Sequence, residues 1–132
     1  MSRYELEFVT QGGKELVQVR LFGQADHANL EALIAELDAA VRDRHPVGIL
    51  VDESELKPGL IGIDDVRTIV VRWRKANDLR AARIAVFAPN PLVFGLNRVV
   101  ESLAARDKRM TMRAFRERGS ALGWLMGFSA IS

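Results

Sequence analysis

The stretch VGILV (residues 47–51) decides the fold, because it is a short and continuously apolar run in an otherwise mixed chain. A second run of the same kind, IAVFA, occupies residues 84–88. Strands that are apolar on both faces are typical of parallel sheets covered by helices. The two runs therefore predict neighbouring parallel strands at the centre of an α/β domain.

The segment before the first run predicts an antiparallel hairpin. Apolar and charged residues alternate from Tyr4 to Phe8, which is the period of a strand, and a second strand is expected at about 15–22. Gln11-Gly12-Gly13 lies between them and supplies turn residues. Two short strands around a Gly-rich turn are expected to pair antiparallel.

Two amphipathic helices are expected around the first apolar run. Asp26 is the expected N-cap of the first helix, which ends at His45-Pro46 because proline cannot continue it. A loop at 54–63 then leads to a second helix, capped near Asp64 or Asp65. The predicted apolar faces are Leu30, Leu33, Ile34, Leu37 and Val41 in the first helix, and Val66, Ile69, Val70 and Trp73 in the second.

A third helix is expected to begin at Asn90-Pro91, an N-cap followed by proline at the first helical position. An edge strand at 110–115 and a short final helix follow. The predicted inward residues are Leu92, Leu96, Val99, Val100 and Leu103 in the third helix, and Leu122, Trp124 and Leu125 in the last. The order ββαβαβαβα predicts an α/β fold with a mixed, mostly parallel five-stranded sheet flanked by helices.

The length of 132 residues fits a single domain, residues 1–132, with one core. Hydrophobic residues make up 48% of the chain and charged residues 27%, which is typical of a globular domain. There is no cysteine, which excludes disulfides and thiolate chemistry. We expect a cytoplasmic protein without a transmembrane segment, because no signal peptide or long apolar stretch is visible.

The net charge of +2 conceals an asymmetry between the two halves of the chain. Residues 1–65 contain 6 Lys or Arg and 13 Asp or Glu, whereas residues 66–132 contain 13 and 4. A basic half suggests nucleic acid as a partner. The basic residues are scattered, however, and show no RNA-binding or helix-turn-helix spacing. We therefore predict a solvated surface and no nucleic-acid partner.

Four segments carry a resemblance to a known family: GILVDESEL (48–56), the basic second helix, RIAVFAPN (83–90) and MRAFRERGSALGWL (112–125). With the predicted order of elements, they resemble the SpoIIAA-like family, relatives of STAS domains that include anti-sigma-factor antagonists. The resemblance covers roughly Tyr4 to Leu125. It implies a regulatory, protein-binding domain of this fold, and it is specific for architecture rather than for role.

One departure from the family pattern concerns phosphorylation. Phospho-regulated STAS domains have a Ser or Thr at the start of the helix after the third strand. This chain reads KPGLIGIDDVRT (57–68) there, so Asp64 and Asp65 precede the first hydroxyl, Thr68. A phosphate beside two carboxylates would meet like-charge repulsion. The two acids either cap the helix or mimic a permanently phosphorylated state, and capping is the simpler interpretation.

Three strand-to-helix turns are expected to converge at the carboxyl edge of the sheet, where α/β proteins bind ligands. They contribute Asp26 and His27, Asp52 and Ser54, and Asn90. A hydrolase triad would need Ser54 beside His27 and an acid, but Ser54 lacks a Gly-x-Ser-x-Gly elbow and an oxyanion loop. We predict no catalytic residue.

A metal site and an anion site are the other chemical possibilities for these turns. A metal could recruit His27, Asp52 and Glu53, but His45 is expected roughly 25 Å away at the other end of the first helix. No metal and no cofactor is predicted. Backbone N–H groups at the start of the third helix could accept an anion, with Arg98 two turns along, although every helix offers such groups.

Two surfaces remain as candidates for partners. Arg67, Arg74 and Lys75 form a basic face on the second helix, which is either solvated or faces an acidic partner, such as the acid-rich first helix of another copy. The apolar tail at 124–128 either closes the core or makes a dimer contact.

The function predicted from the sequence is a non-catalytic interaction or regulatory module that binds a protein partner or itself. The first alternative is a protein that binds a small apolar or anionic molecule, or a lipid. A cavity beside Trp73 or Trp124 would favour that alternative. A hydrolase that uses Ser54 is the third hypothesis.

Overall fold

The computed structural model describes residues 4–24, 27–57 and 63–127. Its strands are β1 (Tyr4–Gln11), β2 (Lys14–Gln24), β3 (Gly48–Lys57), β4 (Arg83–Phe87) and β5 (Thr111–Phe115). Its helices are α1 (His27–Arg44), α2 (Ile63–Lys75), the 3-10 turn η1 (Leu79–Ala81), α3 (Pro91–Ala104) and α4 (Arg118–Leu125). None of the described helices is both long and apolar enough to cross a membrane.

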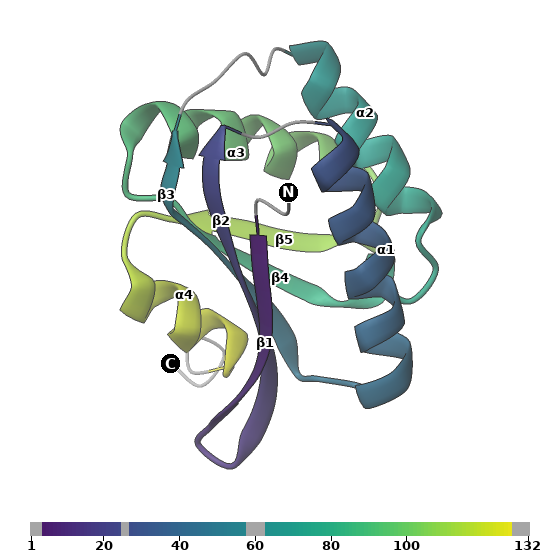
Figure 1. Ribbon diagram of the computed structural model, residues 1–132, viewed down its shortest axis with the longest axis vertical. Coiled ribbons are helices and arrows are strands. Elements are labelled where there is room, and N and C mark those ends of the chain that lie inside the picture. Colours follow the sequence, from purple (N-terminus) through teal and green to yellow (C-terminus); the bar gives the residue numbers. More distant parts are fainter. Residues whose placement is uncertain (1–3, 25–26, 58–62, 128–132) are drawn as a thin grey trace.

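The strands form one sheet in the order β1-β2-β3-β4-β5 (Figure 1). β1 and β2 are antiparallel, and the other neighbours are parallel. Ile49 of β3 lies opposite Ile84 of β4, and Val51 lies opposite Val86. The predicted mixed, mostly parallel sheet is therefore confirmed, and the two apolar runs are adjacent strands at its centre.

The hairpin between β1 and β2 closes with a two-residue loop. Gln11 pairs with Lys14, and Gly12 and Gly13 between them have φ angles of 55° and 77°. Positive φ at both positions characterises the turn whose twist matches that of paired strands, and glycine adopts it without steric cost. The predicted Gly-rich turn is confirmed.

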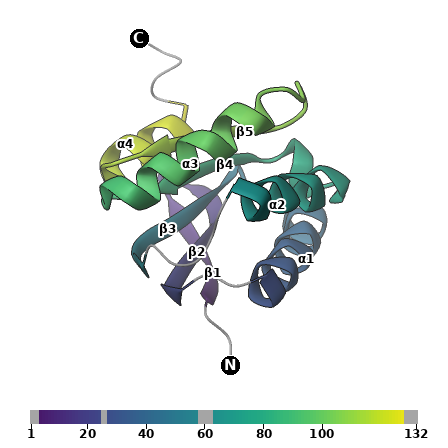
Figure 2. The same ribbon diagram turned by 90° about the horizontal axis from the view of Figure 1, so that it is seen from above.

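The two faces of the sheet are covered differently. On one face, α1, α2 and α3 enclose the main core, which includes Leu33, Val70, Trp73 and Val93. On the other face, α4 packs Ala121 and Leu125 onto Leu50 and Ala85. Figure 2 shows α1 and α4 on opposite sides of the sheet. The predicted final helix thus closes a second, smaller core. Residue 128 of the apolar tail lies outside the described residues.

Two boundaries differ from the prediction. Residues 54–57, expected in a loop, continue β3, because the long β2 offers pairing partners as far as Gln24 opposite Lys57. Helix α2 begins at Ile63, so Asp64 and Asp65 lie in its first turn rather than before it. Carboxylates there still interact favourably with the positive end of the helix dipole.

The start of α3 is as predicted, but its inward face is not. The side chain of Asn90 caps the helix by accepting from the backbone N–H groups of Leu92 and Val93. Leu92, predicted to face inward, is 67% exposed, whereas Val93 and Asn97 are buried. The buried face of α3 therefore includes an amide side chain among apolar ones.

Candidate functional site

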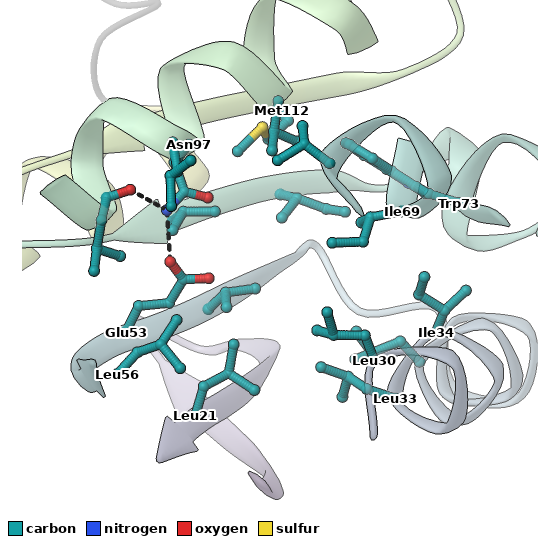
Figure 3. A pocket seen from close by; sticks show the side chains of 18 of the residues that line it. Leu21, Leu30, Leu33, Ile34, Glu53, Leu56, Ile69, Trp73, Asn97 and Met112 are labelled. Carbon is teal, nitrogen blue, oxygen red and sulfur yellow. Dashed lines mark hydrogen bonds between the residues drawn. The ribbon is translucent and has the colours of Figure 1, made fainter. Parts of the chain in front are cut away.

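An apolar pocket of about 160 Å³ lies between the sheet and the helices α1, α2 and α3 (Figure 3). Helix α1 contributes Leu30, Leu33, Ile34 and Leu37, and α2 contributes Val66, Ile69 and Trp73. The sheet and α3 supply the remaining walls, among them Leu21, Val51, Leu56, Ile84, Val86, Val93, Leu96 and Met112. The apolar faces predicted for α1 and α2 thus line a pocket as well as a core.

Glu53 is the one carboxylate that lines this pocket among the described residues. Side chains alternate between the two faces of a strand, so Val51 and Glu53 of β3 share the face that α1–α3 cover. Asp52 lies between them and reaches Arg118 of α4 on the opposite face, with 3.6 Å between Oδ2 and Nη1. The strand therefore sends one acid into the apolar pocket and the other toward a cation.

The Glu53 carboxylate is buried, with 8% of the residue exposed, and it is held by Asn97 of α3. Asn97 Nδ2 donates to Glu53 Oε1 over 2.5 Å and to the carbonyl oxygen of Val93 over 3.0 Å. Burial raises the pKa of Glu53 from 4.5 to about 7. Within this net shift, the hydrogen bond from Asn97 acts to lower the pKa of Glu53, and the neighbouring charge of Asp52 acts to raise it.

Asp52 and Ser54 form a local motif rather than a catalytic pair. The backbone N–H and the hydroxyl of Ser54 both donate to Asp52 Oδ1, at 2.9 and 2.6 Å. The described partner of the Ser54 hydroxyl is an aspartate paired with Arg118, not a histidine as in a hydrolase triad. The residues beside Ser54 thus give the hydrolase hypothesis no support.

Among the other site residues predicted from the sequence, Asp64 and Asn90 interact locally, within or beside their own helices. Asp26 lies outside the described residues, as does the side chain of His27. Asp64 is exposed and forms an ion pair with Arg67, while Asn90 serves as the cap of α3. No group of three or more His, Cys, Asp or Glu side chains that could hold a metal ion occurs in residues 4–24, 27–57 and 63–127.

Thr68, the first hydroxyl of α2, is engaged in its own helix. Its Oγ1 donates to the carbonyl oxygen of Asp64, one turn earlier, over 3.0 Å. Threonine hydroxyls in helices commonly bond back in this way. The position of Thr68 within α2 differs from the helix-start hydroxyl of the phosphorylated pattern.

A second, basic hollow of about 580 Å³ lies between α2 and the turn that joins α3 to β5. Two of its cations, Arg67 and Arg74, belong to the predicted basic face. Three more were not assigned from the sequence: Arg106, Lys108 and Arg109. The rest of the lining is the apolar Val70, Val71 and Leu103 and one carboxylate, that of Asp107. Lys75 lies outside this basic hollow and is exposed.

Asp107 does not neutralise the basic hollow. Arg109 chelates its carboxylate with two bonds of 3.1 Å, and Arg74 Nε lies 3.7 Å from it. These hydrogen bonds with Arg109 lower the pKa of Asp107, so it stays ionised. Arg67, Arg106 and Lys108 keep the hollow strongly positive, because the one acid paired with any of these three in the described part is the exposed Asp64.

The Glu53–Asn97 pair is the feature that the sequence analysis missed. Glu53 was considered only as a possible metal ligand, and Asn97 was not considered at all. A signal was present, because Asn97 lies four residues after Val93 and therefore on the same face of an apolar helix. An amide at such a position must find a partner when it is buried.

Comparison with solved structures places this fold among known ones. An uncharacterised protein of the DUF3478 family with a SpoIIAA-like fold from Shewanella loihica is 16% identical, with a TM-score of 0.65 over 95% of each chain. The anti-sigma factor antagonist SpoIIAA in its unphosphorylated form is 22% identical, with a TM-score of 0.61 over 94% of this chain and 96% of that one. An anti-sigma factor antagonist from Mycobacterium paratuberculosis is 19% identical, with a TM-score of 0.54 over 93% and 94%.

Comparison with curated proteins gave no match. The SpoIIAA-like family model matches residues 16–126, from the first core residues of β2 to the end of α4. That match covers most of the sheet, all four helices, the apolar pocket and the basic hollow. This chain belongs to the SpoIIAA-like family.

Proposed function

We propose that this chain is a non-catalytic regulatory module that binds a small apolar molecule in the pocket between the sheet and helices α1–α3. The observation that carries the proposal is the pocket itself, an apolar space with one buried carboxylate. Protein interiors pack tightly and leave few voids larger than a water molecule. Apolar pockets with a few convergent polar groups are typical of ligand sites.

The volume limits the size of the ligand. An engineered cavity of about 150 Å³ in another protein binds benzene, and this pocket has about 160 Å³. Sites for drug-sized ligands are larger, at roughly 300–1,000 Å³. The pocket therefore suits one ring or a short alkyl chain, and a whole lipid is too large for it.

Helix α2 supports a regulatory role, because it contributes side chains to both the apolar pocket and the basic hollow. Val66, Ile69 and Trp73 line the apolar pocket, while Arg67 and Arg74 line the basic one. A ligand that binds better to one position of α2 would shift that helix and so change the basic surface. Ligand binding inside and partner binding outside are then linked through one helix.

Titration of the ¹⁵N-labelled protein with toluene, followed by NMR chemical shifts, tests the proposal. We expect the largest chemical-shift changes at pocket-lining residues and smaller ones along α2. Ile69→Phe, whose ring would fill the space, should weaken binding at least tenfold. Val71→Phe is the matched control, since Val71 lies on the same helix but is 44% exposed and does not line the pocket. Unchanged spectra up to the solubility limit of toluene would remove the proposal.

The second candidate function is docking of an acidic protein segment in the basic hollow. Five cations line the basic hollow and would attract an acidic segment. Anti-sigma factor antagonists, which share this fold, act through protein partners. Self-association through an acid-rich α1 stays a prediction. Two of its acids are engaged within the chain, because Glu31 pairs with Arg72 over 3.1 Å and Asp38 binds backbone of η1.

Affinity capture with wild-type and Arg106→Glu/Lys108→Glu baits tests this second candidate. We expect a partner that binds the wild type, is released by salt and is absent from the double variant. Lys75→Glu is the control, because Lys75 is an exposed cation of α2 outside the basic hollow. Sedimentation of the same proteins reports whether the partner is a second copy. Equal capture of the partner by all baits would exclude the basic hollow as its docking site.

A further inference from the structure

The polar side chains that line the apolar pocket are Glu53, Asn97 and Lys57, and Glu53 holds a hydrogen-bond acceptor that has no donor among the described residues. Asn97 has two amide hydrogens, and both are used, one by Glu53 Oε1 and one by the Val93 carbonyl. In Figure 3 the second carboxylate oxygen of Glu53 faces the interior of the pocket. No described residue donates to that oxygen. When Glu53 is ionised, this oxygen can only accept, so it is left as an acceptor without a donor.

We propose that the pocket selects a neutral alcohol of about one ring in size, whose hydroxyl donates to the free oxygen of Glu53. This inference rests on the proposed function and assigns its ligand class. The hydroxyl supplies the donor that this oxygen lacks, and a hydrogen bond to an ionised group is stronger than one between neutral groups.

The pocket is polar on one side and apolar on the other, which suits a ligand with a single polar end. Glu53 and Asn97 lie together on one side of it, and Trp73, Leu30 and Ile34 lie on the other (Figure 3). A ligand that donates to Glu53 therefore places its hydrocarbon body between α1 and α2. Because the lining there is apolar, the hydrocarbon body disturbs no polar interaction of the protein.

Charged ligands of the same size fit less well. A carboxylate would face the Glu53 carboxylate and offer no donor, so its charge is repelled. An ammonium would be attracted, but its hydration must be removed in an apolar space, and Lys57 at the pocket adds a like charge. The neutral donor avoids both costs.

A matched set of four ring-sized probes tests the selection: toluene, benzyl alcohol, benzylamine and benzoate. Binding is measured at pH 8, where Glu53 is mainly ionised, by tryptophan fluorescence in a Trp124→Phe background. Trp73, which lines the pocket, is then the one tryptophan of the chain. We expect benzyl alcohol to bind about tenfold more tightly than toluene, and benzoate at least tenfold more weakly than benzyl alcohol.

Glu53→Met removes the acceptor at similar size and should make benzyl alcohol and toluene bind equally. Glu55→Met is the control, because Glu55 lies on the same strand with its side chain 56% exposed. If Glu53→Met does not fold, the four-probe series on the protein with Glu53 still tests the inference.

Equal affinities of toluene and benzyl alcohol for the wild type would overturn the inference and leave the proposed function in place. Tighter binding of benzylamine or benzoate would overturn it in favour of a charged ligand. Absence of binding by all four probes would overturn both.

Discussion

Asn97 of α3 donates to Glu53 of β3 over 2.5 Å, although 44 positions separate them in the chain. The bond ties a helix to the central strand inside an apolar core. It leaves a carboxylate that is buried without a cation as its partner in the described structure. Burying a charge in this way is costly, so the pKa of Glu53 is raised.

We predict that the contribution of Glu53 to the stability of the protein falls as the pH rises from about 4.5 to 7. The pKa of Glu53 is 4.5 in the unfolded chain and about 7 in the folded one, so the folded state holds the proton more tightly. Stability is fully present below pH 4.5, and about 3 kcal/mol is lost by pH 7 and above. Asp52 contributes to this shift, whereas Arg118 faces Asp52 on the other side of the sheet.

Urea denaturation of the wild type and Glu53→Gln across pH 4–9 measures this effect. The difference between the two isolates Glu53, because other groups titrate alike in both. We expect similar stability at low pH and a more stable variant at pH 8, while Glu55→Gln follows the wild type. A difference that does not change with pH would contradict the assignment.

Asn97→Leu should raise the pKa of Glu53 further. The hydrogen bond from Asn97 is the interaction that lowers this pKa, so its loss leaves only effects that raise it. The variant should be less stable at pH 8 by about 1–3 kcal/mol, with a smaller loss at pH 5. Titration of the Glu53 side-chain carboxyl carbon by NMR checks the direction. A pKa that stays the same or falls would contradict the role given to Asn97.

The sequence predicts the sheet well because its signals are local. The apolar runs at 47–51 and 84–88 and the Asn90-Pro91 cap each depend on residues close together in the chain. The end of β3 was missed because residues 54–57 are mostly polar, and only the length of β2 makes them a strand. Leu92 was placed inward for its apolar side chain, but the first turn of α3 leaves it exposed.

The candidate site could be predicted only in part, because it depends on contacts between distant segments. The apolar stripes of α1 and α2 were predicted, and they line the pocket. The pairing of Glu53 with Asn97 requires α3 to pack across β3, which no local pattern specifies. The basic hollow likewise combines Arg67 of α2 with the turn at 106–109. Composition indicated a basic half without indicating where its charges meet.

Gly48→Ala should destabilise the protein by about 1–3 kcal/mol through overpacking. A Cβ at Gly48 would lie 2.6 Å from Leu125 Cδ2 and 3.3 Å from the carbonyl oxygen of Arg83. Leu125 is buried in the small core under α4, so moving its side chain would disturb that packing. Gly119→Ala is the control, because a Cβ there meets nothing within 4 Å. Chemical denaturation of both measures the effect, and equal stability would show that α4 adjusts freely.

Asp38→Ala should destabilise the protein by about 1–3 kcal/mol, because two backbone donors lose their acceptor. Asp38 Oδ1 accepts from the N–H groups of Asp78 and Leu79, at 2.9 and 2.8 Å, and so anchors η1 to α1. Leu79 is buried and lines the pocket, and its carbonyl oxygen lies 3.5 Å from Trp73 Nε1. The variant should therefore also shift the fluorescence of Trp73.

Asp38→Asn keeps the acceptor oxygen and should retain most of the stability. Asp43→Ala, on the same helix with a side chain 69% exposed, should change the free energy of unfolding by less than about 0.5 kcal/mol. Urea denaturation followed by far-ultraviolet circular dichroism ranks the three variants. If Asp38→Ala and Asp43→Ala lost the same amount, the anchoring of η1 would not stabilise the fold, and the wall of the pocket at Leu79 would be held by packing alone.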